Sequence, residues 1–327
     1  MTPSSLPLAI GIDFGGTSIK SALVQGPQLL RQAPPINPQN TSARQTLDAI
    51  SEAISELCSD LPSHVPIGIG LPGLVDSTHG VVHGLSNVEG WEDVPVRQFL
   101  ANRFDVPVIL ENDANAMAYG EWRYGAAQHA RSAICITLGT GVGGALILDG
   151  HLYRGARLAA GELGHVSIDH HGKPGPYGNR GGLEEYVGNA EITARAQAAY
   201  DAACTPPPAV PCTPEILAMA AHRECPIALA LWEEIASEIG AALASAVWLL
   251  NPEIIVIGGG VAKAGDPLFG PLRDTVRQRT SKVLHEELRI VPALLGNHAG
   301  AIGCAALALD AALAADPLTH ALTMAPS

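Results

Sequence analysis

Three polar residues follow a short apolar run, and their types suit proton transfer to or from a hydroxyl. The run is Val106–Leu110, and Glu111-Asn112-Asp113 comes directly after it. Asp and Asn are ordinary N-caps of helices, so capping is the simplest explanation of one of them. A cap needs only one residue, however, and a carboxylate here could accept a proton from a bound hydroxyl. Asp113 is therefore a candidate general base.

Two glycine-rich strings could hold the phosphate groups that such a base would serve. Asp13-Phe14-Gly15-Gly16-Thr17 follows the strand-like run Leu8–Ile12, and Gly139-Thr140-Gly141 follows Ala133–Leu138. A second strand-like run comes after each string, which predicts a β-hairpin with a glycine turn. Glycines let backbone N–H groups come close to an anion, and threonine hydroxyls add donors. A plain tight hairpin is the alternative explanation of either turn.

The polar residues around the first turn suit a metal-bound nucleotide. Asp13 opens the turn and could hold Mg²⁺, often through water, because this ion prefers oxygen ligands. Lys20 could pair with a phosphate, although a solvated lysine on a hairpin is the simpler explanation. A third glycine run, Gly258-Gly259-Gly260, follows the strand-like run Glu253–Ile257. Three glycine turns after strands favour nucleotide binding over three unrelated hairpins.

Two strings fit the pattern G-x-G-x-x-G, namely Gly68–Gly73 and Gly139–Gly144. That pattern indicates dinucleotide binding only between a strand and a helix. The second string runs into the strand-like residues Ala145–Leu148, and the first contains Pro72 and is followed by no helical pattern. A Rossmann nucleotide site is therefore rejected.

Further polar candidates lie in the middle of the chain. Gly161-Glu162-Leu163-Gly164-His165 places Glu162 and His165 three residues apart between glycines, and Glu184 follows Gly182-Leu183. A turn with a solvated acid is the alternative explanation of the first string. Glu184 could simply favour the first turn of a helix, where an acid is stabilised by the helix dipole.

The elements that must position these residues indicate two α/β domains of related design. A strand, a glycine turn and a strand occur at residues 8–24 and again at 133–148. Thr41–Cys58 and Pro226–Leu250 have helical spacing of apolar residues, and Ala299–Ala314 is an alanine-rich closing helix. Apolar residues make up 47% of the chain but aromatics only 4%. This composition predicts helices that pack closely through small residues.

Composition also argues against several classes of protein. The net charge is −13 and the 19 Lys and Arg are scattered, so a nucleic-acid partner is not expected. The six cysteines form no C-x-x-C pair, which is typical of thiols in a reducing compartment. The first residues lack a signal-peptide pattern, and the apolar stretch Ile239–Leu250 is too short to span a bilayer. We expect a cytoplasmic protein without a membrane partner.

Taken in chain order, these strings resemble those of the ROK family of sugar kinases and regulators. The resemblance runs from about residue 8 to about residue 312. The matching strings are Asp13-Phe14-Gly15-Gly16-Thr17 with Lys20, Leu71-Pro72-Gly73, Glu111-Asn112-Asp113-Ala114-Asn115-Ala116, Gly139-Thr140-Gly141-Val142-Gly143-Gly144, Gly161-Glu162-Leu163-Gly164-His165, Gly181-Gly182-Leu183-Glu184 and Ile257-Gly258-Gly259-Gly260-Val261.

The resemblance implies a fold and a set of roles. The fold is α/β, actin-like and hexokinase-like (ribonuclease H-like), with two lobes and the active site in the interlobe cleft. The smaller lobe would be residues 1–113 plus 300–327, and the larger lobe residues 114–299. A homodimer is also implied.

Within that fold, Asp113 would be the catalytic base. The residues that would bind the sugar are Gly73, Asn87, Asn112, Asp113, Glu162, His165 and Glu184. The residues that would surround ATP and Mg²⁺ are Asp13, Gly15, Gly16, Thr17, Lys20, Thr140, Gly141 and Gly259. Asp13 would meet the Mg²⁺ ion through water.

One departure from the family concerns a zinc-binding segment, C-x-C-G-x-x-G-C-L-E, which acts together with the motif histidine. Its three cysteine positions hold Gly175, Tyr177 and Gly182 in this chain. Structural zinc is therefore not expected. Backbone hydrogen bonds, the prolines Pro174 and Pro176 and packing of Tyr177 should hold the loop instead. His170 or His171 could rescue a metal site with His165, which is the alternative.

The implied reaction is transfer of the γ-phosphoryl group of ATP to a sugar hydroxyl, most simply the C6 hydroxyl of glucose. N-acetylglucosamine, N-acetylmannosamine, mannose and fructose remain alternative acceptors, because sugar choice depends on pocket contacts. Polyphosphate is an alternative donor. From another class, a sugar-responsive regulator without catalysis would need a DNA-binding segment of roughly 60 residues. The first strand here is expected to begin near Leu8.

Overall fold

The structure, a computed structural model of the 327-residue chain, describes residues 6–61, 63, 65–85, 88 and 90–315. Its contacts separate two compact units, Met1–Gln128 with Asn297–Ser327 and His129–Gly296. The sequence places the lobe boundary after residue 113, whereas the first unit here retains the helix that begins at Asp113. That helix packs along the last helix of the chain, which accounts for its place in the first unit.

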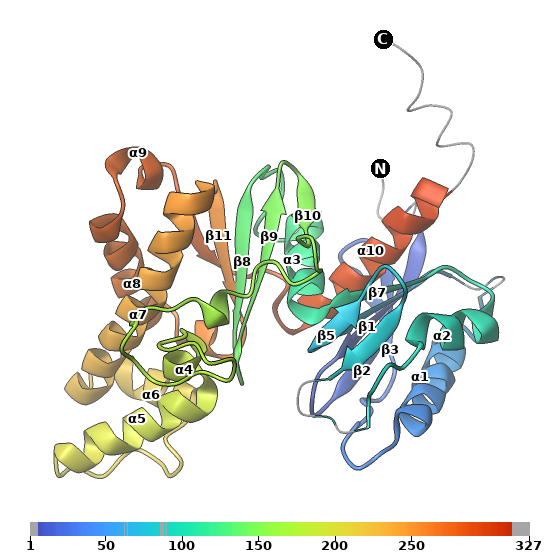
Figure 1. Cartoon of the computed structure of the whole chain (residues 1–327). Coiled ribbons are helices and arrows are strands. Elements are labelled where there is room, and N and C mark those ends of the chain that lie inside the picture. The colour runs from blue at the N-terminus through green and yellow to red at the C-terminus, as the bar shows by residue number, and fades with distance from the viewer. Residues whose placement is uncertain (1–5, 62, 64, 86–87, 89, 316–327) are drawn as a thin grey trace. The chain divides into compact units, whose positions relative to one another are not determined.

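The first unit is built on a five-stranded sheet in the order β3-β2-β1-β4-β7 (Figure 1). Its strands are β1 (Leu8–Phe14), β2 (Ile19–Gln25), β3 (Gln28–Gln32), β4 (Ile67–Leu71) and β7 (Val108–Asn112). A separate hairpin consists of β5 (Leu74–Asp76) and β6 (Val81–Gly84). The helices are α1 (Ala43–Leu57), α2 (Val96–Phe104), α3 (Asp113–Tyr124) and α10 (Ala299–Ala315), and the short η4 (Gly296–His298) precedes α10.

Helices cover both faces of this sheet. Ile10 and Ile12 lie in the core that α1 joins through Leu47 and Ile50. Successive side chains of a strand point to opposite faces, so Gly11 faces the other way, where α10 lies. A Cβ on Gly11 would overlap the carbonyl oxygen of Ala301 in α10. The small residue of β1 therefore lets α10 rest directly on the strand backbone.

The contact between α3 and α10 confirms that helices of this chain pack closely through small residues. A Cβ on Gly303 of α10 would overlap the carbonyl oxygen of Ala116 in α3. A Cβ on Gly120 of α3 would lie 2.6 Å from the carbonyl oxygen of Ala299. The two backbones thus approach to a distance that no larger residue permits at these positions.

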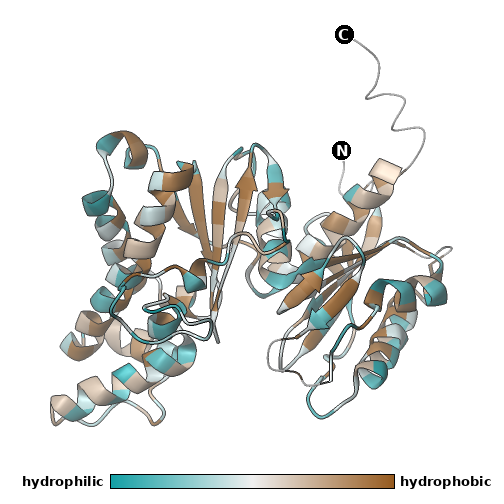
Figure 2. Ribbon diagram, in the orientation of Figure 1, coloured by the Kyte–Doolittle hydropathy of each residue, from teal (hydrophilic) through white to brown (hydrophobic). Residues whose placement is uncertain are grey.

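The second unit has a five-stranded sheet of its own, in the order β10-β9-β8-β11-β12. Its strands are β8 (Ala133–Leu138), β9 (Val142–Leu148), β10 (His151–Tyr153), β11 (Ile254–Gly258) and β12 (Arg289–Pro292). Its helices are α4 (Glu184–Val187), α5 (Asn189–Ala202), α6 (Pro214–Ala221), α7 (Pro226–Leu250), α8 (Asp266–Arg279) and α9 (Lys282–His285), with the short turns η2 (Leu163–His165) and η3 (Val261–Ala264). Figure 2 shows apolar residues along its central strands β8 and β11.

The two sheets repeat one topology, which confirms the internal duplication predicted from residues 8–24 and 133–148. In each sheet three strands in chain order form an antiparallel meander. The first strand of the meander also pairs with a parallel strand, and a second parallel strand follows at the edge of the sheet. The parallel neighbours are β4 and β7 in the first sheet and β11 and β12 in the second. The glycine turns follow corresponding strands, β1 and β8.

Among the described residues, one helical stretch, Gly296–Ala315, is long and apolar enough to cross a membrane by length and composition. The apolar stretch singled out in the sequence, Ile239–Leu250, lies instead inside α7. α10 packs against β1, β4 and α3, and ten of its residues are buried. Its apolar composition is therefore accounted for by its place in the core.

Candidate functional site

The glycine turn after β1 leaves its backbone open to close approach by a bound group. β1 extends through Phe14, so Asp13 lies in the strand and the turn begins two residues later than expected. The Gly15 N–H donates to the carbonyl oxygen of Ser18 at 3.0 Å. A Cβ on Gly15 would lie 2.9 Å from that oxygen, and Thr17 is exposed at the tip. Backbone and hydroxyl groups are therefore presented to solvent at this turn.

Asp13 is half-buried near the end of β1. Its cross-strand neighbour is Lys20 of β2. Burial raises the pKa of the Asp13 carboxyl, and the charge of Lys20 offsets part of that rise. A Cβ on Gly300, near the start of α10, would lie 2.8 Å from the carboxyl carbon of Asp13. A buried carboxyl of this kind gains from a nearby cation, which favours its ionised form.

The three polar residues after β7 have different partners. The amide oxygen of Asn112 accepts hydrogen bonds from the backbone N–H groups of Ala114 at 2.9 Å and Asn115 at 3.1 Å. Asn112 is thus the N-cap of α3, and the capping explanation applies to it and not to Asp113. Glu111 is buried and accepts from the Asn112 backbone N–H and the Asn115 side chain.

Asp113 is the first residue of α3 and is half-buried. One of its carboxylate oxygens accepts from the Ala114 N–H at 2.8 Å. The positive end of the helix dipole stabilises the ionised form of a carboxylate at this position. Since Asn112 satisfies the helix end and Glu111 supports the local backbone, Asp113 is the member of the trio suited to accept a proton.

The strand register brings Asp13 and Asp113 to the same edge of the first sheet. Asp13 pairs with Gly70 of β4, and Gly70 pairs with Glu111 of β7. A Cβ on Gly70 would lie 3.6 Å from the Cα of Asp113. Asp13 near the end of β1 and Asp113 directly after β7 therefore lie at the carboxyl ends of two parallel strands on either side of β4, where ligands bind in open α/β sheets. Gly70 and Gly300 carry no signal in the sequence that would have marked them as part of this site.

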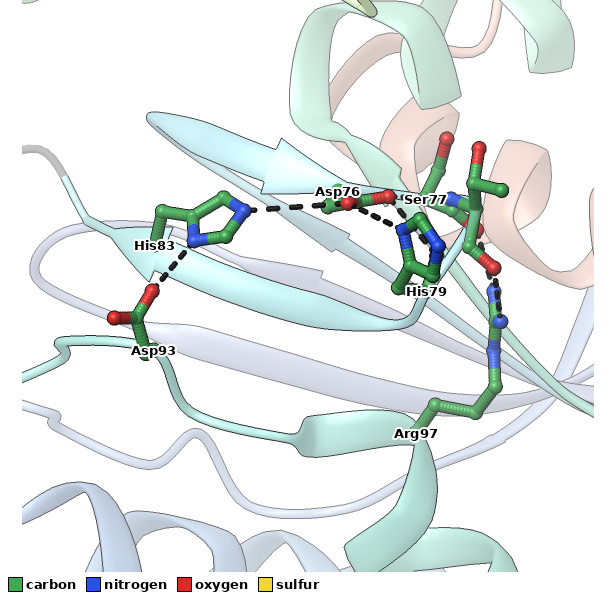
Figure 3. A network of polar contacts seen from close by, with 7 residues as sticks. Asp76, Ser77, His79, His83, Asp93 and Arg97 are labelled. Carbon is green, nitrogen blue, oxygen red and sulfur yellow. Dashed lines mark hydrogen bonds and ion pairs between the residues drawn. The ribbon is translucent and has the colours of Figure 1, made fainter.

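Gly73 lies between β4 and β5 with φ +86°, a conformation that favours glycine. The β5–β6 hairpin after it carries the polar network of Figure 3, which joins Asp76, His79, His83 and Asp93. Asp76 contacts the His79 ring at 2.7 Å, and the His83 ring contacts Asp93 at 2.6 Å. The expected sugar contact Asn87 lies outside the described residues.

Arg97 of α2 reaches the loop of this hairpin (Figure 3). Its guanidinium donates to the carbonyl oxygens of Ser77 at 2.5 Å and Thr78 at 2.8 Å. It also donates to the carbonyl oxygen of Val108 in β7 at 3.1 Å. The hairpin that follows Gly73 is therefore fixed to the strand that ends in Asn112.

In the second unit, the glycine turn after β8 is bound to Glu184. The Gly139 N–H donates to the carbonyl oxygen of Gly141 at 3.0 Å, and Thr140 is exposed at the tip. A carboxylate oxygen of Glu184 accepts from the Val142 N–H at 2.7 Å. A Cβ on Gly141 would overlap that carboxylate oxygen. The sequence predicts Glu184 as a sugar contact and does not reveal this link to the turn.

Glu162 and His165 gather beside Glu184 in the same unit. Gly161 has φ +91°, and a Cβ there would lie 2.9 Å from the carbonyl oxygen of Gly144 in β9. Burial raises the pKa of the Glu162 carboxyl most, a charged His165 lowers it, and the charge of Glu184 raises it. The three side chains predicted to bind sugar in this unit are therefore close enough to act on one another electrostatically.

The third glycine run lies beside the second turn. Gly259 follows β11 with φ +87°, and a Cβ there would overlap the carbonyl oxygen of Leu138 at the end of β8. Glycine is thus required for the chain to pass the turn and enter η3. Over the described part of the chain, no group of three or more His, Cys, Asp or Glu side chains is arranged to hold a metal ion.

Comparison with known proteins gives one family. The sequence model of the ROK family matches residues 9–311. The chain is 32% identical to a glucokinase from Streptomyces coelicolor over 315 residues, covering 93% of this chain and 98% of that protein. It is 28% identical to a xylose repressor from Bacillus spizizenii over 313 residues, covering 92% of this chain and 77% of the repressor.

Solved structures agree with this assignment. A ROK family glucokinase from Streptomyces griseus, solved in complex with glucose and AMPPNP, superposes with a TM-score of 0.77 at 30% identity. The match covers 93% of this chain and 100% of that chain. The mixed α/β, actin-like and hexokinase-like fold expected from the sequence is confirmed. With its motifs in the family order and the family match spanning residues 9–311, the chain belongs to the ROK family.

Proposed function

We propose that this protein transfers the γ-phosphoryl group of ATP to a free hexose, with glucose as the preferred acceptor. The observation that carries the proposal is the placement of Asp13 and Asp113 at the carboxyl ends of β1 and β7, two parallel strands that flank β4 in one sheet. A cation-binding carboxylate and a proton-accepting carboxylate at one sheet edge suit phosphoryl transfer to a hydroxyl. The relatives from Streptomyces coelicolor and Streptomyces griseus, both named glucokinases, support glucose as the acceptor.

The proposed roles follow from the groups that each residue presents. Asp113 accepts the proton of the sugar hydroxyl as the new P–O bond forms. Phosphoryl transfer depends mostly on positioning and on neutralising charge. MgATP enters as the substrate, with Asp13 near its metal ion and the glycine turns donating backbone N–H groups to its phosphates. Gly15, Gly16, Thr17, Lys20, Thr140, Gly141 and Gly259 form the set assigned to the nucleotide.

Sugar hydroxyls are assigned to a second set of residues. They are Gly73, Asn87, Asn112, Glu162, His165 and Glu184. Because the Asn112 amide oxygen caps α3, we assign sugar binding to its amide nitrogen. Because Glu184 accepts from Val142, a sugar bound to Glu184 would be coupled to the position of the second glycine turn.

The direct test is sugar-dependent release of ADP. Glucose, mannose, fructose, N-acetylglucosamine and N-acetylmannosamine are each supplied with ATP, with and without Mg²⁺. We expect the highest kcat/KM with glucose and no turnover without Mg²⁺. If the kcat/KM were higher with an N-acetylhexosamine than with glucose, that sugar would be the preferred acceptor instead. Absence of ADP with every sugar would reject an ATP-dependent kinase of these sugars.

The similarity to a xylose repressor supports a second candidate, a sugar-responsive regulator without catalysis. Such a protein would bind sugar, detectable by calorimetry, without forming ADP. Asp113 at the start of α3 favours the kinase, because sugar sensing alone requires no proton acceptor. The two candidates are separated when binding and ADP release are measured on the same preparation.

Gly300→Ala should weaken use of MgATP. The added Cβ would lie 2.8 Å from the Asp13 carboxyl carbon, so that side chain or the start of α10 must move. We expect the KM for MgATP to rise about ten-fold or more, since small displacements of positioning groups are costly. Steady-state kinetics at varied MgATP checks this. An unchanged KM would show that Asp13 is not positioned by α10 for the nucleotide.

As the pH falls, the KM for glucose should begin to rise at a higher pH than it would if Glu162 had the usual pKa of a glutamate. Burial raises the pKa of Glu162 above its usual 4.5, so protonation begins at a higher pH and removes the hydrogen-bond acceptor. KM measured from about pH 5 to about pH 8 should therefore increase towards the acid end. Glu162→Gln should remove that dependence and raise KM at neutral pH. The exposed Glu215→Gln serves as the control, and an identical pH profile in both variants would contradict the assignment.

A further inference from the structure

The loop between His165 and Glu184 does not fit the structural zinc that the family resemblance implies. Structural zinc takes four nitrogen or sulfur ligands, usually with several thiolates. The three positions concerned hold Gly175, Tyr177 and Gly182, which offer no thiolate or imidazole. In the residues the structure describes, no cluster of His, Cys, Asp or Glu is arranged to replace them.

The loop is closed by its own backbone. The Gly175 N–H donates to the carbonyl oxygen of Asn179 at 2.8 Å. The Gly181 N–H donates to the carbonyl oxygen of Lys173 at 2.7 Å, and Pro174 forms an antiparallel bridge with Arg180. These bonds fold residues 173–181 into a tight excursion whose two ends lie side by side.

The returning end of the loop is joined to the segment after His165. The Ile168 N–H donates to the carbonyl oxygen of Gly181 at 2.8 Å, and the Leu183 N–H donates to that of Val166 at 3.1 Å. The Ser167 hydroxyl adds a bond to the carbonyl oxygen of Arg180 at 2.7 Å. The backbones that carry His165 and Glu184 are thus linked by this short ladder.

The side chain of Asn179 fills the space between two of the former ligand positions. A Cβ on Gly175 would overlap its amide oxygen, and a Cβ on Gly182 would lie 3.4 Å from its amide nitrogen. That nitrogen donates to the carbonyl oxygen of His165 at 3.4 Å. The amide oxygen is buried without a hydrogen-bond partner among the described residues. Any side chain at Gly175 would therefore compete with Asn179 for this space.

The third former ligand position holds an aromatic ring that meets His165 directly. The rings of Tyr177 and His165 have centroids 5.1 Å apart and an interplanar angle of 87°, an edge-to-face contact. Such pairs have a preferred geometry as well as packing energy. Tyr177 is otherwise 79% exposed, so this contact is what gives the ring a place in the folded chain.

We propose that Asn179 and Tyr177 take over the work of the absent metal and hold His165 in place. The Asn179 side chain holds the backbone of His165, and the Tyr177 ring holds the His165 ring. They are positioning residues, because they contact His165 and act on the sugar through it. The kinetic part of this inference rests on the proposed function. The part that concerns metal and stability does not depend on any activity.

The first experiment measures metal content and its effect on stability. The protein is produced in medium supplemented with zinc, purified, and analysed by atomic emission with and without EDTA treatment. We expect far less than one zinc per chain and the same Tm before and after EDTA. About one zinc per chain together with a lower Tm after EDTA would overturn the proposal, whatever the protein catalyses.

The second experiment compares variants of the two residues. Asn179→Ala and Tyr177→Ala should each raise the KM for glucose about five-fold or more, the equivalent of one lost hydrogen bond or aromatic contact, with a smaller change in kcat. Tyr177→Phe keeps the ring and should restore the original KM. Tyr153→Ala removes another exposed aromatic ring of the same unit, in β10, and should leave KM unchanged.

Two results would reject the positioning role. One is a KM for glucose in Asn179→Ala and Tyr177→Ala equal to that of the Tyr153→Ala control. The other is a Tyr177→Phe variant as impaired as Tyr177→Ala, which would assign the effect to the hydroxyl and not to the ring. If the unmodified protein forms no ADP with any sugar, the proposed function fails first. The Tm of the same variants is then measured with and without EDTA. If the loop holds no metal, EDTA should change the Tm of none of them.

Discussion

Asp113→Asn is expected to lower kcat with glucose by about 10²-fold or more, because the general base is removed from the reaction. The substitution keeps the size of the side chain and an oxygen that can accept from the Ala114 N–H. The helix cap is supplied by Asn112, so α3 should remain intact. We therefore expect an unchanged Tm and a KM for glucose within a few-fold of the original value.

The matched control is Asp105→Asn, in the same unit. Asp105 is exposed and ends α2 in the left-handed conformation with φ 53°, which asparagine also adopts readily. Its kcat and Tm should both stay at their original values. Near-normal turnover in Asp113→Asn would contradict the assignment of the base. A fall in Tm of several degrees together with the loss of activity would indicate a structural role for Asp113 instead.

Gly303→Ala is expected to destabilise the first unit by about 2 kcal/mol, the scale of an overpacked core. A Cβ there would overlap the carbonyl oxygen of Ala116 and lie 2.9 Å from the Gly120 nitrogen. Both are backbone atoms, so the neighbours cannot give way by changing a rotamer. For a unit of this size, about 1 kcal/mol corresponds to roughly 2–4 °C in Tm, and calorimetry should show a fall of several degrees in its transition.

Gly270→Ala provides the control in a helix of the other unit. Gly270 lies inside α8, and apart from its chain neighbours a Cβ there would meet nothing within 4 Å. We expect a change within about 1 kcal/mol, because the gain from replacing a helical glycine is opposed by the restriction that Pro271 places on the residue before it. Since the two glycines lie in different units, the two transitions should be resolved separately. A similar effect of both substitutions would contradict the close contact of α3 and α10.

Much of the architecture could be predicted because its signals are local. β8, β9 and α7 have the bounds that hydrophobic periodicity indicates, since a strand or helix buries one face at a fixed period. The short edge elements, such as the β5–β6 hairpin, were not predicted. Their few residues alternate weakly, and they depend on contacts such as those of Arg97.

The assignment of partners to individual polar residues required the fold. Glu111, Asn112 and Asp113 are equivalent as a polar cluster in the sequence. Only the hydrogen bonds show that Asn112 caps the helix and that Glu111 serves the local backbone. Glu184 likewise looks like an ordinary first-turn acid until its bond to the Val142 N–H, 42 residues away, is seen. Local patterns cannot specify a partner that chain folding brings from a distance.

Local sequence patterns were enough to specify the glycine turns, the repeated strand–turn–strand units and the candidate base after a buried strand. These features depend on residues within one or two turns of each other, where propensity and periodicity act directly. The tertiary structure alone decided that Gly300 lies against Asp13 and that Asn179 fills the space between Gly175 and Gly182. Those contacts arise from close packing of segments, and a position that must stay small leaves no local pattern in the chain.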